Sequence, residues 1–160
     1  MLFSDITILD EQFCMKKHQY VLTEGALIKS ISQVPPQDYT GEVYSGKNKL
    51  LVTGLYNLHT HAAMTLLRGY GEGLPLQRWL TERVFPFEDH MTDEDAYWGA
   101  LLGFSEMLRC GTVSASDMYL FPDGVARAAV DSGIKLNLAA PGGRKRILAY
   151  HGAADGRLRC

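Results

Sequence analysis

The spacing of apolar residues predicts short strands in the first third of the chain. Ile6 and Ile8 alternate with polar neighbours, and residues 20–22 and 26–31 form short β-prone runs. Glu24-Gly25 between these runs is a turn signal. Strands this short and this close together favour a small sheet over β-α-β units.

The pattern changes at residue 50, where longer apolar and helical periods begin. Residues 50–58 are nearly continuous apolar sequence, which is typical of a strand covered on both faces. Pro75 suits the first turn of a short helix, and Pro86 is expected to stop it. Residues 92–95 resemble a capping box at the start of a second helix. The apolar face of that helix comprises Tyr97, Leu101, Phe104 and Leu108, and Gly111 is expected just past its end.

The next residues continue the alternation of strands and helices. Residues 112–116 and 134–139 are expected as strands, and a helix is expected from Pro122 to Gly133. A β-α-β-α-β order with connections of this length implies parallel strands. Residues 142–160 show no clear period and are expected to form a loop or tail.

Composition narrows the range of functions. The chain has 160 residues, of which 46% are apolar and 21% charged, with a formal net charge of -2. No apolar run approaches the ~18–20 residues of a membrane span. The first residues lack the basic and apolar regions of a signal peptide. No basic pattern dominates the chain, so we expect neither a membrane nor a nucleic acid as a partner.

Cysteine usage and charge distribution add two observations. The three cysteines, Cys14, Cys110 and Cys160, are odd in number and widely spaced, which favours a reduced, cytoplasmic setting over a disulfide framework. Residues 142–160 contain five basic residues and one acid, whereas acids outnumber basic residues before them. Five charges without interleaved aromatic residues remain a poor nucleic-acid footprint.

The strongest chemical signal is His59-Thr60-His61, directly after the apolar run. Residues i and i+2 of an extended chain lie on the same side, so both imidazoles can reach one divalent ion. The carboxyl end of a barrel strand is the usual place for an active site. The competing interpretation is a loop in which two polar residues happen to flank a threonine.

Residues 51–69 resemble the opening segment of the amidohydrolase superfamily. Within this superfamily, the segment is most similar to the branch that contains the 5′-methylthioadenosine/S-adenosylhomocysteine deaminases and the triazine chlorohydrolases. The resemblance covers residues 1–140, and Thr53 stands where the family usually has proline. The other matching segments are Leu74-Pro75-Leu76, Trp79-Leu80, Phe85-Pro86-Phe87-Glu88, residues 106–112 and Asp117-Met118-Tyr119.

The resemblance implies an α/β fold. It implies a TIM-like (β/α)8 barrel, of which about three strands fit in this chain, preceded by a small β-sandwich segment. We therefore expect an N-terminal β-sandwich segment at residues 1–50 and the first part of the barrel at residues 51–141. A divergent basic tail is expected at residues 142–160.

The resemblance also implies a site and a reaction. His59 and His61 match the first two ligands of a mononuclear site for zinc, with iron as the other option. Glu88 matches a position whose carboxylate binds substrate, although by itself it could equally be a solvated loop acid. The implied reaction is hydrolytic deamination of a purine nucleoside or similar amino-heterocycle by metal-activated water. A guanine deaminase or a chlorohydrolase remains an alternative.

Several other side chains are weaker candidates for a functional role. Asp117 ends a predicted strand, where a structural hydrogen bond is the expected role. Arg68 lies close to the histidines in sequence, Trp79 is expected in the core or a pocket wall, and Cys110 is expected to be a buried, inert thiol. Surface positions are expected for the histidines without a partner at ligand spacing, which are His18, His90 and His151.

The rest of the family's site has no counterpart in this chain. A third histidine ligand, an aspartate ligand and the acid–base His and Glu lie on later strands, and a substrate-binding Arg would fall near Ala140. We expect no catalytic acid–base residue here, and a truncated reading frame, as from a frameshift after Pro141. A partial barrel has open strand edges, so little activity alone and self-association are expected. The alternative to an enzyme is a non-catalytic remnant or a fragment that complements another chain.

Overall fold

The computed structural model describes residues 1–139 and the backbone of residues 148–150. The chain divides into two compact units, Met1–Thr53 and Gly54–Cys160. Each unit has its own sheet, and the two sheets together contain parallel and antiparallel pairs. The protein is therefore an α/β protein with mixed sheets. Within the described residues, no helix is both long and apolar enough to cross a membrane.

The first unit is a five-stranded mixed sheet, as the short alternating runs predict. Its order is β3-β2-β1-β4, with β5 also paired to β1. Ile6, Ile8 and Val21 form its small buried cluster. Gly25, in the left-handed region at φ 58°, makes the expected turn between β2 and β3. The strands are β1 (Leu2–Leu9), β2 (Met15–Glu24), β3 (Leu27–Ser32), β4 (Val43–Ser45) and β5 (Leu50–Leu51).

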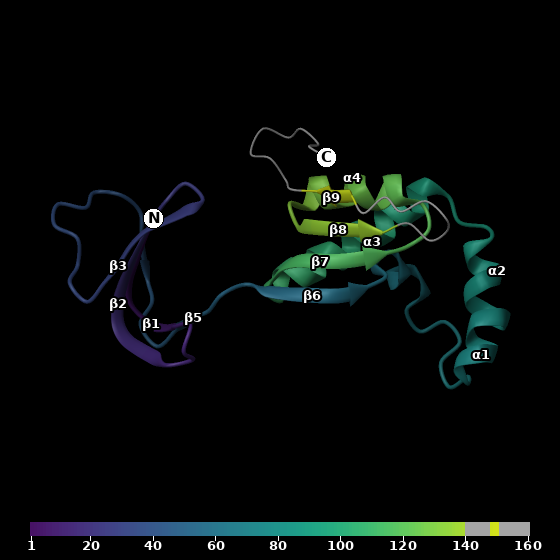
Figure 1. Ribbon diagram of the computed structural model, residues 1–160, viewed down its shortest axis with the longest axis horizontal. Helices are drawn as coiled ribbons and strands as arrows, with labels where there is room; N and C mark the ends of the chain where they lie inside the picture. Colours follow the sequence, from purple (N-terminus) through teal and green to yellow (C-terminus); the bar gives the residue numbers. More distant parts are fainter. Residues whose placement is uncertain (140–147, 151–160) are drawn as a thin grey trace. The chain divides into compact units, whose positions relative to one another are not determined.

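The second unit is built on a four-stranded sheet in the order β6-β7-β8-β9. β6 pairs parallel with β7, and β7 pairs parallel with β8, so the expected parallel arrangement is confirmed. The arrowheads of these three strands in Figure 1 point toward the side of the unit where α1 and α2 lie. The strands are β6 (Leu55–Thr60), β7 (Thr112–Met118), β8 (Lys135–Ala139) and β9 (Leu148–Tyr150).

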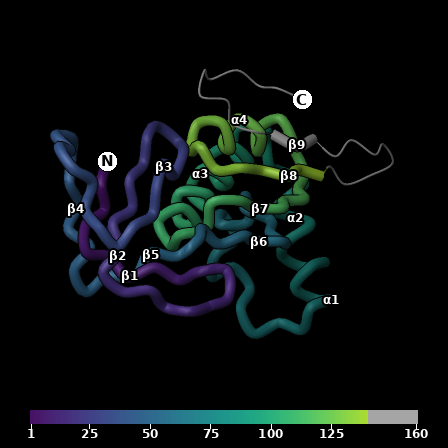
Figure 2. The backbone as a smooth tube through the Cα atoms, turned by 60° about the vertical axis from the view of Figure 1, so that its left-hand side comes forward, coloured from purple at the N-terminus to yellow at the C-terminus, as the bar shows by residue number. Residues whose placement is uncertain are grey.

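Helices α3 and α4 pack against each other and against the sheet, as the two views in Figures 1 and 2 show. Phe104 from α3 and Val125 from α4 are fully buried with Leu138 of β8 in one core. Gly133, at φ 78°, ends α4 as expected. The helical segments are η1 (Ala62–Leu67, 3-10), α1 (Leu76–Trp79), η2 (Leu80–Val84, π), α2 (Phe85–Glu88), α3 (Asp93–Arg109) and α4 (Pro122–Ser132).

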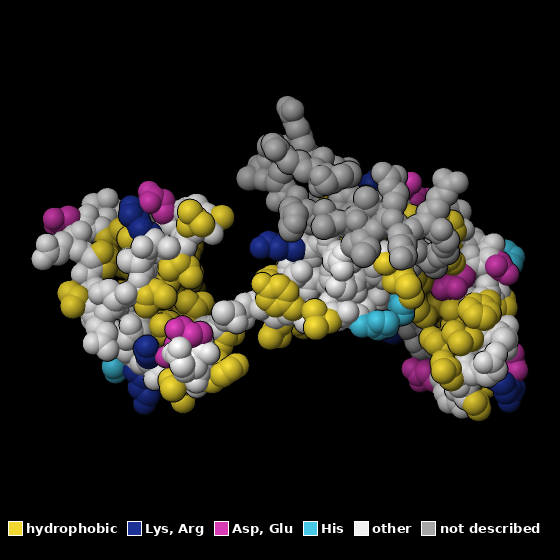
Figure 3. Space-filling model, viewed as in Figure 1, with side chains coloured by type: hydrophobic (Ala, Val, Ile, Leu, Met, Phe, Trp, Pro, Cys, Tyr) yellow, Lys and Arg dark blue, Asp and Glu magenta, His cyan; other side chains and the backbone are white. Residues whose placement is uncertain are grey.

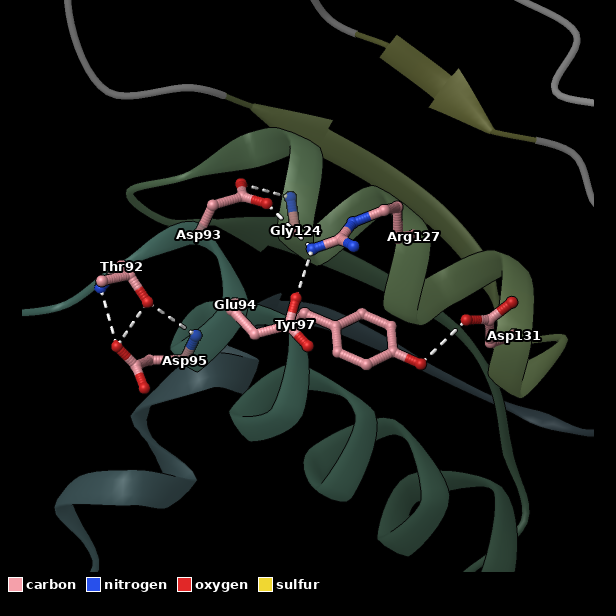
Figure 4. A network of polar contacts seen from close by, with 8 residues as sticks. All are labelled: Thr92, Asp93, Glu94, Asp95, Tyr97, Gly124, Arg127 and Asp131. Atoms are coloured by element: carbon pink, nitrogen blue, oxygen red, sulfur yellow. Dashed lines mark hydrogen bonds and ion pairs between the residues drawn. The ribbon is translucent and has the colours of Figure 1, made fainter.

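The predicted capping box at the start of α3 is confirmed. The Thr92 hydroxyl accepts a hydrogen bond from the Asp95 N–H, and the Asp95 carboxylate accepts one from the Thr92 N–H. Asp93 extends this start toward α4, where it accepts the Gly124 N–H at 2.8 Å. Figure 4 shows the resulting network, in which Arg127 of α4 bridges Asp93 and Glu94. The two helices are thus joined by polar contacts at the surface as well as by the core.

Strand β6 is exposed, which corrects the expectation of a strand covered on both faces. Tyr56 and Leu58 are 68% and 79% exposed. β6 lies at the edge of its sheet and pairs only with β7 among the described strands. The continuous apolar run therefore has neither a second neighbouring strand nor a full covering layer within the described residues.

Pro86 does not stop the helix, which continues to Glu88 through the π-helical segment η2. A proline inside a helix removes one hydrogen-bond donor and crowds the preceding turn. The wider turn of η2 ends at Val84, directly before α2, and Pro86 then occupies the first turn of α2. The expected end at Pro86 is therefore wrong because the helix changes its pitch instead of breaking.

The expected tail is also corrected in part. Residues 148–150 form β9, which pairs antiparallel with β8 from Leu136 to Leu138. The other positions of residues 140–160 lie outside the described residues. The outer edge of β8 thus has a backbone partner, which reduces the open edge that a three-stranded sheet would leave.

Gly99 allows α3 to pack closely on η1, the segment that follows His61. A Cβ at position 99 would lie 2.5 Å from the Ala63 carbonyl oxygen and 2.9 Å from Leu66 Cγ. The Thr65 hydroxyl also donates a hydrogen bond to the Gly99 carbonyl at 2.6 Å. We expect Gly99→Ala to lower the free energy of unfolding by about 1–3 kcal/mol through overpacking, although alanine favours helices.

Gly103→Ala is the matched control for this substitution, one turn further along α3. Its Cβ would lie 3.0 Å from the Ala62 carbonyl oxygen, so the overlap is smaller. Urea denaturation of both variants measures the difference. A Gly99→Ala chain as stable as the wild type would contradict the close approach of α3 to η1.

Candidate metal and substrate site

His59 and His61 lie at the carboxyl end of β6, as the sequence pattern requires. Their ring centroids are 4.9 Å apart, and the ring planes are inclined by 84°. His59 is exposed, and its backbone N–H donates a hydrogen bond to the Asn57 side-chain oxygen at 3.2 Å. Two imidazoles this close from positions i and i+2 can contribute to one metal ion.

The tautomer of His61 follows from its hydrogen bond. The Nδ1 atom of His61 contacts the carbonyl oxygen of Met118, the last residue of β7. A carbonyl only accepts, so Nδ1 carries the hydrogen. In the neutral ring this leaves the Nε2 lone pair free, which is the arrangement of a metal-binding histidine held by a backbone carbonyl. The pair therefore fits a zinc or iron ion at two coordination positions.

Asp117 is buried beside these histidines, with 2% of its surface exposed. Its Oδ2 accepts the Ala62 N–H at 2.9 Å, which confirms the expected structural hydrogen bond. Its Oδ1 is buried without a partner among the described residues. Burial raises the pKa of the Asp117 carboxyl to about 6, while the Ala62 N–H and the neighbouring His61 act to lower it.

The donor set for a metal ion is incomplete in this part of the chain. Within the described residues, no group of three or more His, Cys, Asp and Glu side chains is placed to hold a metal ion. Asp117 therefore does not form a third ligand with His59 and His61 in this arrangement. Among residues 1–139, the donors at this point are therefore the two imidazoles.

A hollow of about 550 Å³ joins the carboxyl end of the sheet to the helical segment α1–α2. It brings His61 together with Glu88, which is half-buried at the end of α2. Its walls are mainly apolar, as the hydrophobic surface over α1 and α2 in Figure 3 also indicates. The remaining lining residues are Met64, Leu76, Trp79, Leu80, Val84, Phe85, Met118, Tyr119 and Leu120.

Tyr119 is a lining residue to which sequence reasoning assigned no role. It is 4% exposed, and its hydroxyl donates to the Met91 sulfur at 3.5 Å. Burial and the nearby Glu88 carboxylate raise the pKa of its hydroxyl above the ordinary range. Tyr119 directly follows β7, at the same edge of the sheet as His61, and this position in the sequence could have indicated that it lies near the site.

One of the other candidates forms part of this hollow. Trp79 lines it, as expected of a pocket wall, and its indole N–H donates to the Tyr70 carbonyl at 3.2 Å. Arg68 instead pairs with Glu106 of α3 through two hydrogen bonds. Cys110 is exposed, so the expected buried thiol is wrong, because it caps the end of α3 at the surface. His18 and His90 are exposed as expected, and His151 lies outside the described residues.

Comparison with known sequences gives consistent matches. The sequence model of the Amidohydrolase family matches residues 50–145. A 5-methylthioadenosine/S-adenosylhomocysteine deaminase of Dictyoglomus turgidum is 38% identical over 172 residues, covering 99% of this chain and 40% of the relative. A 5'-deoxyadenosine deaminase of Methanocaldococcus jannaschii is 42% identical over 133 residues, covering 82% of this chain and 32% of the relative. The chain thus spans 40% or less of these two relatives.

These matches correct the expected end of the resemblance at Pro141. The family match continues to residue 145, and the Dictyoglomus turgidum match covers 99% of the chain. The change in charge after Pro141 is therefore the remaining observation behind the frameshift hypothesis.

Solved structures with a similar fold carry zinc. The atrazine chlorohydrolase of Arthrobacter aurescens TC1, complexed with zinc, superposes with a TM-score of 0.76 at 17% identity, covering 91% of this chain and 38% of that one. An adenosine deaminase of Xanthomonas campestris with bound zinc gives a TM-score of 0.68 at 26% identity, covering 84% of this chain and 32% of that one. The likeness to the chlorohydrolase concerns the fold alone.

Proposed function

The chain belongs to the amidohydrolase family, and we propose that it carries part of the active site of a metal-dependent deaminase. The observation that carries this proposal is the His59–His61 pair, with the Nδ1 atom of His61 held by the Met118 carbonyl. His59 and His61 would hold one divalent ion, with zinc favoured by the two zinc-containing structures of similar fold. The ion, when bound, supplies a water molecule activated near neutral pH.

We propose that the substrate is a purine nucleoside or a similar amino-heterocycle. The hollow beside His61 is apolar with few polar groups, which suits a flat ring with a limited number of hydrogen-bonding positions. Glu88 would accept hydrogen bonds from hydroxyl groups of the substrate, and Trp79 would form part of the wall. The names of the Dictyoglomus turgidum and Methanocaldococcus jannaschii relatives support a nucleoside.

We also propose that the second unit is the first part of a (β/α)8 barrel and that the first unit belongs to a β-sandwich. The parallel order of β6, β7 and β8, with helices α3 and α4 between them in sequence, supports the barrel. In domain terms, residues 1–50 form the sandwich segment and residues 51–141 the barrel part, whose sheet residues 148–150 extend as β9. We also propose a cytoplasmic location, which the scarce, widely spaced cysteines support.

A second candidate function is a non-catalytic remnant or a fragment that complements another chain. The specific observation in its favour is the exposed edge strand β6, where Leu55 and Leu58 are 58% and 79% exposed. An apolar edge of this kind is suited to pairing with another chain or with a second copy.

We expect the purified chain by itself to release little or no ammonia from 5′-methylthioadenosine. Its described residues supply two of the metal ligands and no complete set, and the apolar edge at β6 promotes self-association. An ammonia-release assay with added Zn²⁺, beside size-exclusion chromatography, measures both. Turnover at a rate typical of enzymes, above about 1 per second, would contradict this expectation.

The proposed function is tested by adding, as a second chain, the part of a relative that this chain does not match. The chain is produced together with the portion of the Dictyoglomus turgidum relative that this chain does not match, and ammonia release is measured. Activity that needs both parts and is lost in His61→Asn supports a deaminase site. Ammonia release from guanine, and chloride release from atrazine in a parallel assay, separate a nucleoside deaminase from the other ring amidohydrolases. No turnover of any substrate by a folded complex favours the remnant.

A further inference from the structure

The carboxyl end of β7 holds the segment around His61 by two separate contacts. Asp117 accepts the N–H of Ala62 through Oδ2 at 2.9 Å, in a buried position. The next residue, Met118, accepts the His61 Nδ1 hydrogen through its carbonyl. The first contact holds the peptide group between His61 and Ala62 and the second holds the His61 ring, so together they set the orientation of that peptide and of the imidazole.

Regular strand pairing does not fix this segment. Asn57 pairs with Ala115 and Thr60 pairs with Asp117, so β6 advances by three residues while β7 advances by two. The extra residue forms a β-bulge at Leu58–His59, and bulges change the direction in which side chains point. Beyond the bulge, the Asp117 side chain takes over the role that ladder hydrogen bonds have in a regular sheet.

The carboxylate acts on the site through the backbone. Asp117 does not form a cluster of three metal-binding groups with the histidines in the described part of the chain. Its side chain is nevertheless 2% exposed, and a buried carboxylate is costly unless it is hydrogen-bonded. We propose that Asp117 is a positioning residue, which holds Ala62 so that His61 meets the Met118 carbonyl and keeps its Nε2 atom free for the metal.

This inference rests on the proposed metal site, but its first test needs no metal. In the metal-free 160-residue chain at about pH 8, above the ordinary histidine pKa of about 6.5, the imidazole nitrogen shifts in NMR spectra report the tautomer of His61. We expect the Nδ1-protonated form in the wild type and in Asp117→Asn, because asparagine retains an oxygen that can accept the Ala62 N–H. We expect a mixture of tautomers in Asp117→Ala.

Zn²⁺ binding gives the second readout, by titration of the same samples. Loss of a group that orients a metal-binding histidine costs about 10–100-fold in affinity, so this decrease is expected for Asp117→Ala and not for Asp117→Asn. Asp123→Ala, which removes an exposed acid from the first turn of α4, is the matched control and should bind Zn²⁺ like the wild type. If Asp117→Ala does not fold, Asp117→Val replaces it, since a branched apolar side chain suits a buried strand.

The outcomes separate this inference from the proposed function. A folded Asp117→Ala chain that keeps the wild-type tautomer overturns the positioning role. An Asp117→Asn chain that behaves like Asp117→Ala also overturns it, because the charge and not the hydrogen bond would then be responsible. A wild-type chain that does not bind Zn²⁺ through His59 and His61 overturns the proposed metal site, and the tautomer measurement still decides the role of Asp117.

Discussion

Replacing His61 with asparagine is expected to weaken Zn²⁺ binding by this chain about 100-fold. A four-ligand zinc site contributes about 10–16 kcal/mol, or about 3 kcal/mol for each ligand, which corresponds to roughly this factor. Because the described residues offer His59 and His61 without a third ligand in their cluster, the loss of one leaves a single imidazole. Zn²⁺ titration followed by NMR of the histidine rings measures the change.

His18→Asn is the matched control for this substitution. His18 lies in the first unit, where it contacts Asp5 at 2.7 Å, and its loss should leave Zn²⁺ binding unchanged. His59→Asn should weaken binding to a similar extent as His61→Asn. Equal Zn²⁺ affinity in the wild type, His59→Asn and His61→Asn would exclude the histidine pair as the metal site.

Phe104→Ala is expected to lower the free energy of unfolding by about 3–5 kcal/mol, the usual cost of removing a buried aromatic ring. Phe104 is fully buried in the core that joins α3 and α4 to β7 and β8. Domains are stable by only about 5–15 kcal/mol, so this loss takes a large part of the stability of the second unit. Because α3 also packs on η1, the segment after His61, the site should be lost with it.

Leu102→Ala provides the comparison on the same helix. Leu102 is 47% exposed, so its truncation should change the free energy of unfolding by about 0.5 kcal/mol or less. Urea denaturation followed by circular dichroism measures both variants. Equal destabilisation by the two substitutions would mean that Phe104 does not occupy the core that joins the helices to the sheet.

Features that depend on neighbouring residues were predictable from the sequence. The capping box at Thr92, the left-handed Gly133 and the turn at Gly25 each depend on hydrogen bonds or backbone preferences within a few positions. The parallel order of β6, β7 and β8 followed from the alternation of strands and helices. The closeness of the His59 and His61 rings was predictable in the same way, because an extended chain places positions i and i+2 on one side.

Other expectations failed where the outcome depended on groups distant in sequence. The apolar run at residues 50–58 is divided between β5 of the first unit and β6 of the second, and the exposure of β6 depends on whether another strand covers it. The helix passed Pro86 because a π-turn accommodated the missing donor. Residues 148–150 joined the sheet because β8 offered an open edge.

Three features could be predicted from the residues alone: the family, most of the strands and helices of residues 1–139, and two imidazoles at one strand end. The way in which those imidazoles are held could not be predicted, because it depends on contacts across the sheet. Asp117 meets Ala62 across 55 positions and Met118 meets His61 across 57, and no local preference predicts which distant group will supply a hydrogen bond. The same holds for Glu88 at the end of α2 and Tyr119 directly after β7, which line the hollow beside His61. Short-range hydrogen bonds and side-chain alternation depend on neighbouring residues. Hydrogen-bond partners across a sheet depend instead on how the whole unit packs.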